Sequence, residues 1–181
     1  MISNCGHDEN GKYSGGKAGD QTGGEYCIRT WYNRPWDCVL RHPKAAVRKD
    51  IARLAQQAAE NERIGYDQKQ RDTFWKQLAL AKNYLPINIT KKCEADCSSS
   101  TVAIIKAVGY RKDIDALKKL SPDLWTGNMR VALIKAGFKC LKGKKYLKTP
   151  NYLRPGDILL NEDYHVAINL DLGSKVEDVQ G

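Results

Sequence analysis

The sequence lacks the features of a membrane or secreted protein. No stretch of its 181 residues approaches the roughly 18 consecutive apolar residues that a membrane span requires. The first nine residues contain no basic segment followed by an apolar one, so they do not read as a secretory signal peptide. We therefore expect synthesis in the cytoplasm without a signal peptide and no insertion into a membrane.

Metal-binding and repeat patterns are also missing. The six cysteines stand at positions 5, 27, 38, 93, 97 and 140, and the C-x₃-C spacing of Cys93 and Cys97 has no second pair at a zinc-finger spacing. There is no D-x-D-x-D loop for calcium and no internal repeat. We expect no metal, no cofactor and mostly reduced, buried cysteines.

Composition is ordinary apart from charge. Hydrophobic residues make up 41% and charged residues 28%, typical of a soluble globular chain of one domain. Thirty Lys and Arg against 21 Asp and Glu give a net charge of +9, which favours encounters with polyanions such as nucleic acid, anionic membrane or a Gram-positive cell wall. No nucleic-acid-binding motif is present. We expect a monomer with no nucleic-acid partner.

Hydrophobic spacing changes along the chain. Residues 1–43 are rich in glycine and aromatics, with a strand expected from Glu25 to Tyr32. Helical spacing over residues 44–61 and 67–82 predicts a helical hairpin. Strands and helices mix after that, so the fold class is α+β, with helices packed against an antiparallel sheet. The later helices are expected near 113–120 and 127–136, and the later strands at 138–141, 146–147, 157–161 and 165–170.

The richest chemical signal surrounds Cys97. The polar run Asp96–Ser100 leads into an apolar helical stretch that Gly109 ends, so Cys97 stands at a helix N-terminus. Unpaired N–H groups and the helix dipole there favour the thiolate, which is the nucleophilic form. Alternatively, Cys97 is one small buried residue among six cysteines.

A cysteine nucleophile needs a base, and three histidines are available. His165 opens an apolar strand after a polar turn and would lie at the mouth of a site. His42 stands in a basic loop, and His7 in a polar N-terminal segment.

These residues carry a family resemblance. Asp96–Ser99 (Asp-Cys-Ser-Ser), Arg154–Leu159 (Arg-Pro-Gly-Asp-Ile-Leu) and His165–Ile168 (His-Val-Ala-Ile) resemble, in order and spacing, the NlpC-type cell-wall cysteine peptidases. These belong to the papain-like superfamily, with the CHAP amidases and phage peptidoglycan hydrolases. The resemblance covers residues 93–170 and implies a papain-like sheet. It also implies that Cys97 and His165 form a thiolate–imidazolium pair, with Cys97 as the nucleophile and His165 as its base.

A second resemblance lies near the N-terminus. Gly19–Gly23 (Gly-Asp-Gln-Thr-Gly) and Tyr32–Trp36 (Tyr-Asn-Arg-Pro-Trp) are similar to a segment that follows the histidine strand in many phage hydrolases. Its position here implies a circular permutation. We therefore divide a single catalytic domain, 1–181, into a permuted sheet segment (1–43), a helical hairpin (44–90), a Cys/His core (91–171) and a tail or linker start (172–181).

The permutation bears on the third catalytic position, the polar residue that orients the histidine. Aligning the moved strand indicates Asn4, with His7 close behind it, whereas counting onward from His165 reaches Glu177. Asn4 is the choice we make. Asp20, Gln21 and Trp36 are candidate substrate-binding residues; Trp31 and Tyr32 share the aromatic character that suits glycan and peptide surfaces. The alternative for these aromatics is a place in the core.

The resemblance implies hydrolysis of an amide bond in peptidoglycan. A γ-D-glutamyl endopeptidase and an N-acetylmuramoyl-L-alanine amidase both cut amides with the same machinery, so the sequence leaves this choice open. A catalytically inactive wall-binding or virion structural module is the alternative, and a thiol enzyme acting on proteins is a third. The expected site of action is the bacterial cell wall, reached by release from a phage-infected cell or on a virion.

Overall fold

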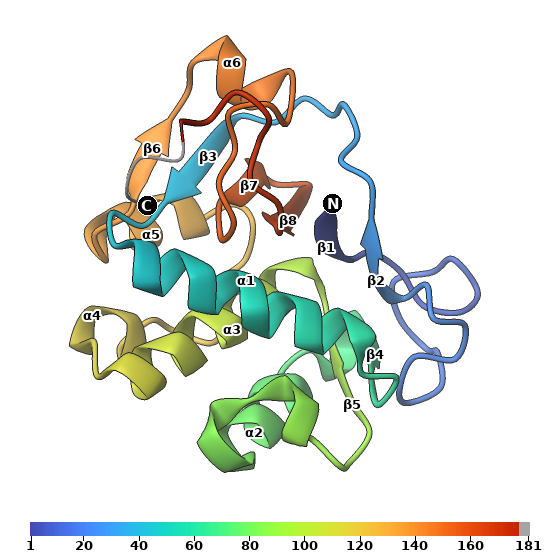
Figure 1. Ribbon diagram of the computed structural model, residues 1–181. Coiled ribbons are helices and arrows are strands. Elements are labelled where there is room, and N and C mark those ends of the chain that lie inside the picture. Colours follow the sequence, from blue (N-terminus) through green and yellow to red (C-terminus); the bar gives the residue numbers. More distant parts are fainter. Residues whose placement is uncertain (178–181) are drawn as a thin grey trace.

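A six-stranded antiparallel sheet forms the centre of the structure (Figure 1), a computed structural model that describes residues 1–177. Its strand order is β2-β1-β8-β7-β3-β6. Every neighbouring pair is antiparallel, so the predicted α+β class with an antiparallel sheet is confirmed. The strands are β1 (Ile2–Cys5), β2 (Tyr26–Arg29), β3 (Cys38–Arg41), β6 (Lys139–Leu141), β7 (Ile158–Asn161) and β8 (His165–Asn169).

The first strand lies inside the sheet. Ile2 of β1 pairs with Arg29 on β2 on one side and with Asn169 on β8 on the other. Residues from the two ends of the sequence are thus neighbours, as the adjacent N label and β8 show in Figure 1.

The long helices pack on one side of this sheet, whereas Tyr146 and Leu147 of the short helix at Lys144–Leu147 join the smaller core on the other. The main ones are α1 (Ala45–Glu60) and α3 (Cys97–Lys112), with α2 (Thr73–Leu80) against α3. Helix α3 is buried from Ser98 to Gly109, because α1, α2 and β8 all pack against it. Shorter helices are α4 (Asp115–Lys118), α5 (Met129–Lys135) and α6 (Lys144–Leu147), and single 3₁₀ turns lie at Gln68–Gln70, Lys82–Tyr84 and Pro86–Asn88.

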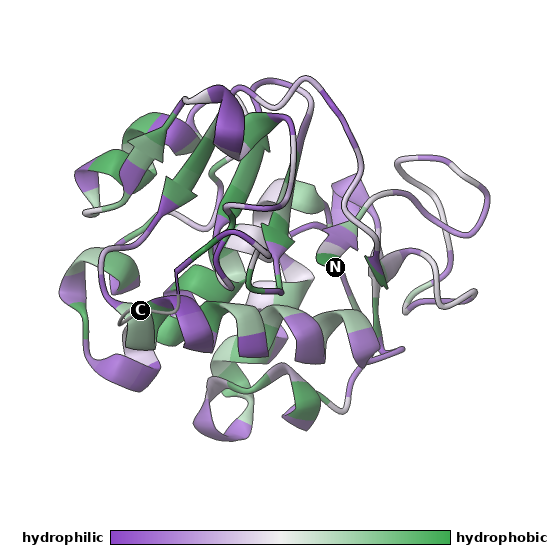
Figure 2. Ribbon diagram, turned by 45° about the horizontal axis from the view of Figure 1, so that its top comes forward, coloured by the Kyte–Doolittle hydropathy of each residue, from purple (hydrophilic) through white to green (hydrophobic). Residues whose placement is uncertain are grey.

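The central strands are apolar on both faces. Leu160 and Val166 join the large core on the helical side, whereas Leu159 and Ala167 join a smaller core on the opposite side. Because side chains alternate along a strand, a sheet covered on both faces needs continuous apolar runs. Figure 2 shows this hydrophobic character in the central strands and the helices below them.

The structure refines the segment 44–90. Its two helices are separated by a short strand, β4 (Ile64–Tyr66), which pairs in parallel with β5 (Cys93–Ala95). Gly65 lets the Gly19 loop pack against β4, since a Cβ at residue 65 would lie 2.3 Å from the carbonyl oxygen of Gly19. The prediction of a strand at residues 146–147 is wrong, because they form the end of α6.

The last described residues pack on the segment before β7. The backbone N–H of Gly173 donates to the carbonyl of Leu153, and that of Lys175 to the carbonyl of Asn151. Residues 172–177 form no strand, and the rest of the predicted tail, 178–181, lies outside the described residues. Among residues 1–177, no helix has both the length and the apolar character needed to cross a membrane.

Candidate active site

A capping box fixes Cys97 at the first position of α3. The Asp96 carboxylate accepts the N–H of Ser99 at 2.8 Å, while the Ser99 hydroxyl accepts the N–H of Asp96 at 2.9 Å. The second oxygen of Asp96 accepts from Nε of Arg71 at 2.8 Å. Strand β5 therefore ends in a rigid corner that holds Cys97 in a defined place.

His165 stands where β8 begins. The turn before it contains Asp163, whose φ of 67° is left-handed, and it returns the chain so that His165 pairs with Asn161 on β7. The ring of Trp36 lies 6.2 Å from the imidazole, centroid to centroid. His165 is therefore buried at the start of a central strand.

The side chain of Asn4 contacts this imidazole directly. Asn4 Oδ1 lies 2.7 Å from His165 Nε2, and both residues are buried. An amide oxygen only accepts hydrogen bonds, so Nε2 carries the proton and Nδ1 of the neutral ring keeps its lone pair. Asn4 thus selects one tautomer of His165.

Asn4, Cys97 and His165 line a single cleft of about 410 Å³. The alternatives for the orienting residue lie differently. His7 lines the cleft but is exposed, with its Nδ1 2.7 Å from the Asp8 carbonyl, and Glu177 is exposed and outside the cleft lining. The structure thus brings the three predicted catalytic residues together, and their catalytic roles stay predictions. The cleft is completed by Gly6, Tyr13, Arg29, Tyr32, Arg34, Tyr66, Gln68, Asp163 and Tyr164.

Burial controls the protonation of Cys97. It raises the pKa of the thiol to about 11, and the charge of Asp96 acts in the same direction. The N–H groups of Val166 and Ser98 oppose this by stabilising the thiolate, as expected at a helix start. Burial outweighs them, so the free protein holds a neutral thiol rather than the expected thiolate.

The imidazole is shifted in the opposite direction. Burial lowers the pKa of His165 to about 4, and the nearby cations Arg34 and Arg29 lower it further. The raised pKa of Cys97 disfavours the thiolate, and the lowered pKa of His165 disfavours the imidazolium. At neutral pH the cleft therefore holds a thiol beside a neutral imidazole.

The predicted substrate-binding residues lie outside the cleft lining. The Asp20 carboxylate accepts the N–H groups of Gly23 and Tyr26, which closes its own loop. Gln21 is exposed and donates to the carbonyls of its own loop. Trp36 is buried in the smaller core behind His165. The structure gives all three a local structural role.

Several other cleft residues were not assigned a role from the sequence, among them Arg29, Arg34, Tyr66 and Gln68. Arg29 ends β2, and Arg34 lies within the Tyr32–Trp36 segment, where only the aromatics drew attention. Tyr66 ends β4, and its hydroxyl accepts from Nε2 of Gln68 at 3.3 Å. For Tyr66 and Gln68, the available sequence signal was the run Gly65-Tyr66-Asp67-Gln68, which indicates a break between two helices.

The Arg154–Leu159 motif supports the sheet. Asp157 is fully buried and binds Arg41 of β3 through two hydrogen bonds of 2.7 and 2.8 Å. Gly156 has a φ of 87°, and a Cβ there would lie 2.1 Å from the Arg48 carbonyl oxygen. Only glycine fits that approach. The motif thus anchors β7, which leads to His165.

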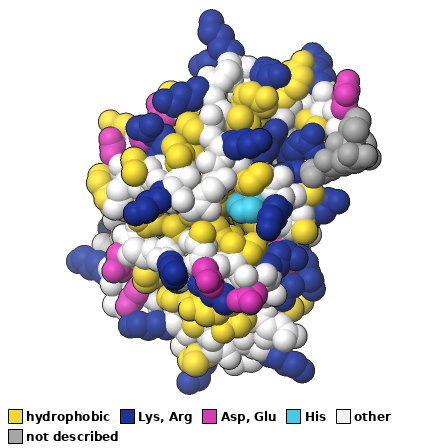
Figure 3. Space-filling view, turned by 90° about the vertical axis from the view of Figure 1, so that its left-hand side faces the viewer, with side chains coloured by type: hydrophobic (Ala, Val, Ile, Leu, Met, Phe, Trp, Pro, Cys, Tyr) yellow, Lys and Arg dark blue, Asp and Glu magenta, His cyan; other side chains and the backbone are white. Residues whose placement is uncertain are grey.

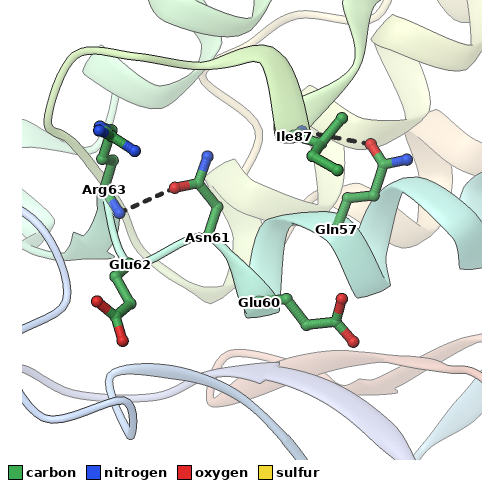
Figure 4. Close-up of a pocket in the computed structure, with 6 residues that line it drawn as sticks. All are labelled: Gln57, Glu60, Asn61, Glu62, Arg63 and Ile87. Carbon is green, nitrogen blue, oxygen red and sulfur yellow. Dashed lines mark hydrogen bonds between the residues drawn. The ribbon is translucent and has the colours of Figure 1, made fainter.

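The hollow at the end of α1 contains no candidate nucleophile and base. The hollow in Figure 4 lies where α1 ends, and its labelled residues Gln57, Glu60, Asn61, Glu62, Arg63 and Ile87 include no cysteine or histidine. Figure 3 shows another face, where hydrophobic side chains and one histidine near the centre lie among scattered Lys, Arg, Asp and Glu. Within residues 1–177, no group of three or more His, Cys, Asp and Glu residues is arranged to hold a metal ion.

Comparison with known proteins gave one match. A family model described as an endolysin-like domain matches residues 2–176. Neither the curated proteins nor the solved structures provided a match. The family match includes every residue of the cleft described above.

Proposed function

Because this chain belongs to the endolysin-like domain family, we propose that it is a cysteine hydrolase that cuts an amide bond in bacterial peptidoglycan. Family membership supports a phage-type protein that acts on the cell wall. The observation that carries the cysteine chemistry is the single cleft containing Cys97, His165 and Asn4.

The first step starts from the neutral pair. A carbonyl of the stem peptide lies against Cys97, and His165 Nδ1 takes the thiol proton as sulfur attacks the carbon. The Nε2–H of the resulting imidazolium donates a hydrogen bond to Asn4 Oδ1, which keeps the ring oriented. Backbone N–H groups at the start of α3, including that of Cys97, stabilise the oxyanion.

The second step releases the products. His165 gives its proton to the leaving amine as the tetrahedral intermediate collapses to a thioester. The ring then takes a proton from water, whose oxygen attacks the thioester carbon, and collapse of that intermediate frees the acid and restores the Cys97 thiol. The hydrolysis is complete with no metal or redox partner.

The scissile bond is an amide of the stem peptide in a Gram-positive wall. We keep two reactions, a γ-D-glutamyl endopeptidase and an N-acetylmuramoyl-L-alanine amidase, since one cleft chemistry serves both. The position of β1 beside β8 supports our further proposal that the sheet is circularly permuted, with an NlpC-type arrangement closed by the first strand.

The decisive experiment is mass spectrometry of muropeptides released from purified walls. We expect wild-type protein to produce new amines or acids at one bond, and Cys97→Ala and His165→Ala to produce none while circular dichroism stays unchanged. Cys140→Ala, at a half-buried cysteine outside the cleft lining, is the matched control and should remain active. If Cys97→Ala still digests walls, the proposal is wrong.

A further inference from the structure

The cleft contains two arginines without an acidic partner. Arg29 and Arg34 line it together with Cys97 and His165. Neither forms an ion pair within residues 1–177. The single carboxylate in the cleft lining is that of Asp163, on the exposed turn before His165. The cleft therefore has an excess of positive charge.

Arg34 is held in a fixed orientation. Its Nε donates to Asn161 Oδ1 at 2.9 Å, and Asn161 in turn donates to the Pro35 carbonyl at 2.9 Å and to Asp37 Oδ2 at 3.1 Å. The two terminal nitrogens of Arg34 have no hydrogen-bond partner among the described residues. A half-buried guanidinium with free paired N–H groups matches the two oxygens of a carboxylate.

Arg34 also marks the junction of two hollows. A second hollow of about 410 Å³ shares Tyr32, Arg34 and Tyr164 with the cleft but does not include Cys97. Arg29 stacks over the ring of Tyr32, 4.3 Å from its centroid. The two cations thus lie on the His165 side of the cleft, where a groove continues away from the thiol.

We propose that Arg34, assisted by Arg29, binds a free carboxylate of the stem peptide on the leaving-group side of the scissile amide. This proposal rests on the proposed function, in which His165 protonates the leaving amine and so faces that part of the substrate. The substrate carboxylate would complete the hydrogen bonding of a guanidinium that the protein itself leaves uncompensated.

The specificity that follows is for acidic over amidated peptides. Amidation of the carboxyl group removes its charge and turns one acceptor into a donor that faces the N–H groups of Arg34. A hydrogen bond to a charged group in such a site corresponds to a difference of roughly 10- to 100-fold in affinity. We expect a preference of this size for the free acid.

The experiment uses two synthetic stem peptides that differ only in a free or amidated carboxyl group on the leaving-group side of the bond that mass spectrometry identifies. If mass spectrometry finds no cut bond, binding is measured instead with several peptide pairs. The two peptides of each pair differ only in whether one particular carboxyl group of the stem peptide is free or amidated. Calorimetry on Cys97→Ala measures binding without turnover, and wild-type kcat/KM measures the same preference when turnover occurs. Arg34→Gln should bring the acid-to-amide ratio close to one, and Arg34→Lys should restore part of it. Arg63→Gln removes an arginine outside the cleft (Figure 4) and should keep the wild-type ratio.

The outcomes separate the two proposals. Equal binding of acid and amide by Cys97→Ala, or an undiminished ratio in Arg34→Gln, overturns carboxylate recognition while leaving the hydrolase intact. If the wild-type protein does not cleave purified walls, the hydrolase proposal is wrong. The ratio of acid to amide binding still decides the role of Arg34 in that case.

Discussion

Replacing Asn4 by aspartate should convert the neutral pair of the cleft into one that is easily charged. The Asn4 amide oxygen lies 2.7 Å from His165 Nε2, so a carboxylate at this place would face the imidazolium directly. Two unit charges about 4 Å apart attract by about 4 kcal/mol at an effective dielectric constant of about 20. That energy corresponds to a pKa shift of about 3 units.

The pKa of His165 should therefore rise from about 4 in the wild-type protein to about 7 in Asn4→Asp. NMR titration of the imidazole carbon-bound protons measures it, and the chain has three histidines to distinguish. His7→Gln removes the exposed alternative and should leave the titration of His165 unchanged. A rise of less than about 1 unit in Asn4→Asp would refute the inferred pairing of residue 4 with His165.

Two further predictions concern stability. Asp157→Asn should lower the free energy of unfolding by about 3 kcal/mol in urea denaturation, because it leaves Arg41 without its buried partner, whereas Asp171→Asn breaks an exposed ion pair and should cost less than about 1 kcal/mol. Equal effects of the two would contradict this. Burial, together with the charges of nearby carboxylates, raises the pKa of Glu94 to about 8, so the folded state holds a proton that the unfolded state loses near pH 4.5. The contribution of protonated Glu94 to folding stability is complete below pH 4.5 and is lost as pH rises through about 8. Glu94→Gln should therefore flatten the decline of melting temperature between these two pH values. An unchanged decline in the variant would exclude Glu94 as its source.

Local patterns in the sequence were sufficient to place the two residues that we propose to react. A polar run before an apolar helix placed Cys97 at a helix start, and an apolar strand after a polar turn placed His165 at a strand start. Both features depend on residues adjacent in the chain. Asn4 came only through the family resemblance, because its contact with His165 spans 161 positions.

Long-range packing explains what the sequence did not reveal. Strand β4 exists because it pairs with β5 and Gly65 admits the Gly19 carbonyl, neither of which has a local signature. Trp36 looked like a binding residue, since exposure cannot be judged from residue type, but it packs behind His165. The neutral state of Cys97 depends on burial in the folded protein, which outweighs the helix-start effect that the sequence suggested.

The place of β1 in the sheet has a consequence for synthesis of the protein. Its partners β2 and β8 are translated after it, and β8 is the last of the six strands in chain order. Strand pairs so far apart in the sequence form slowly, because the entropy cost of closing a long loop comes before any stabilising contact between the strands. Asn4 therefore has no contact with the His165 imidazole until the 161 positions between them have been translated. The candidate site thus stays incomplete on the ribosome until β8 has been translated, because of the order of its strands.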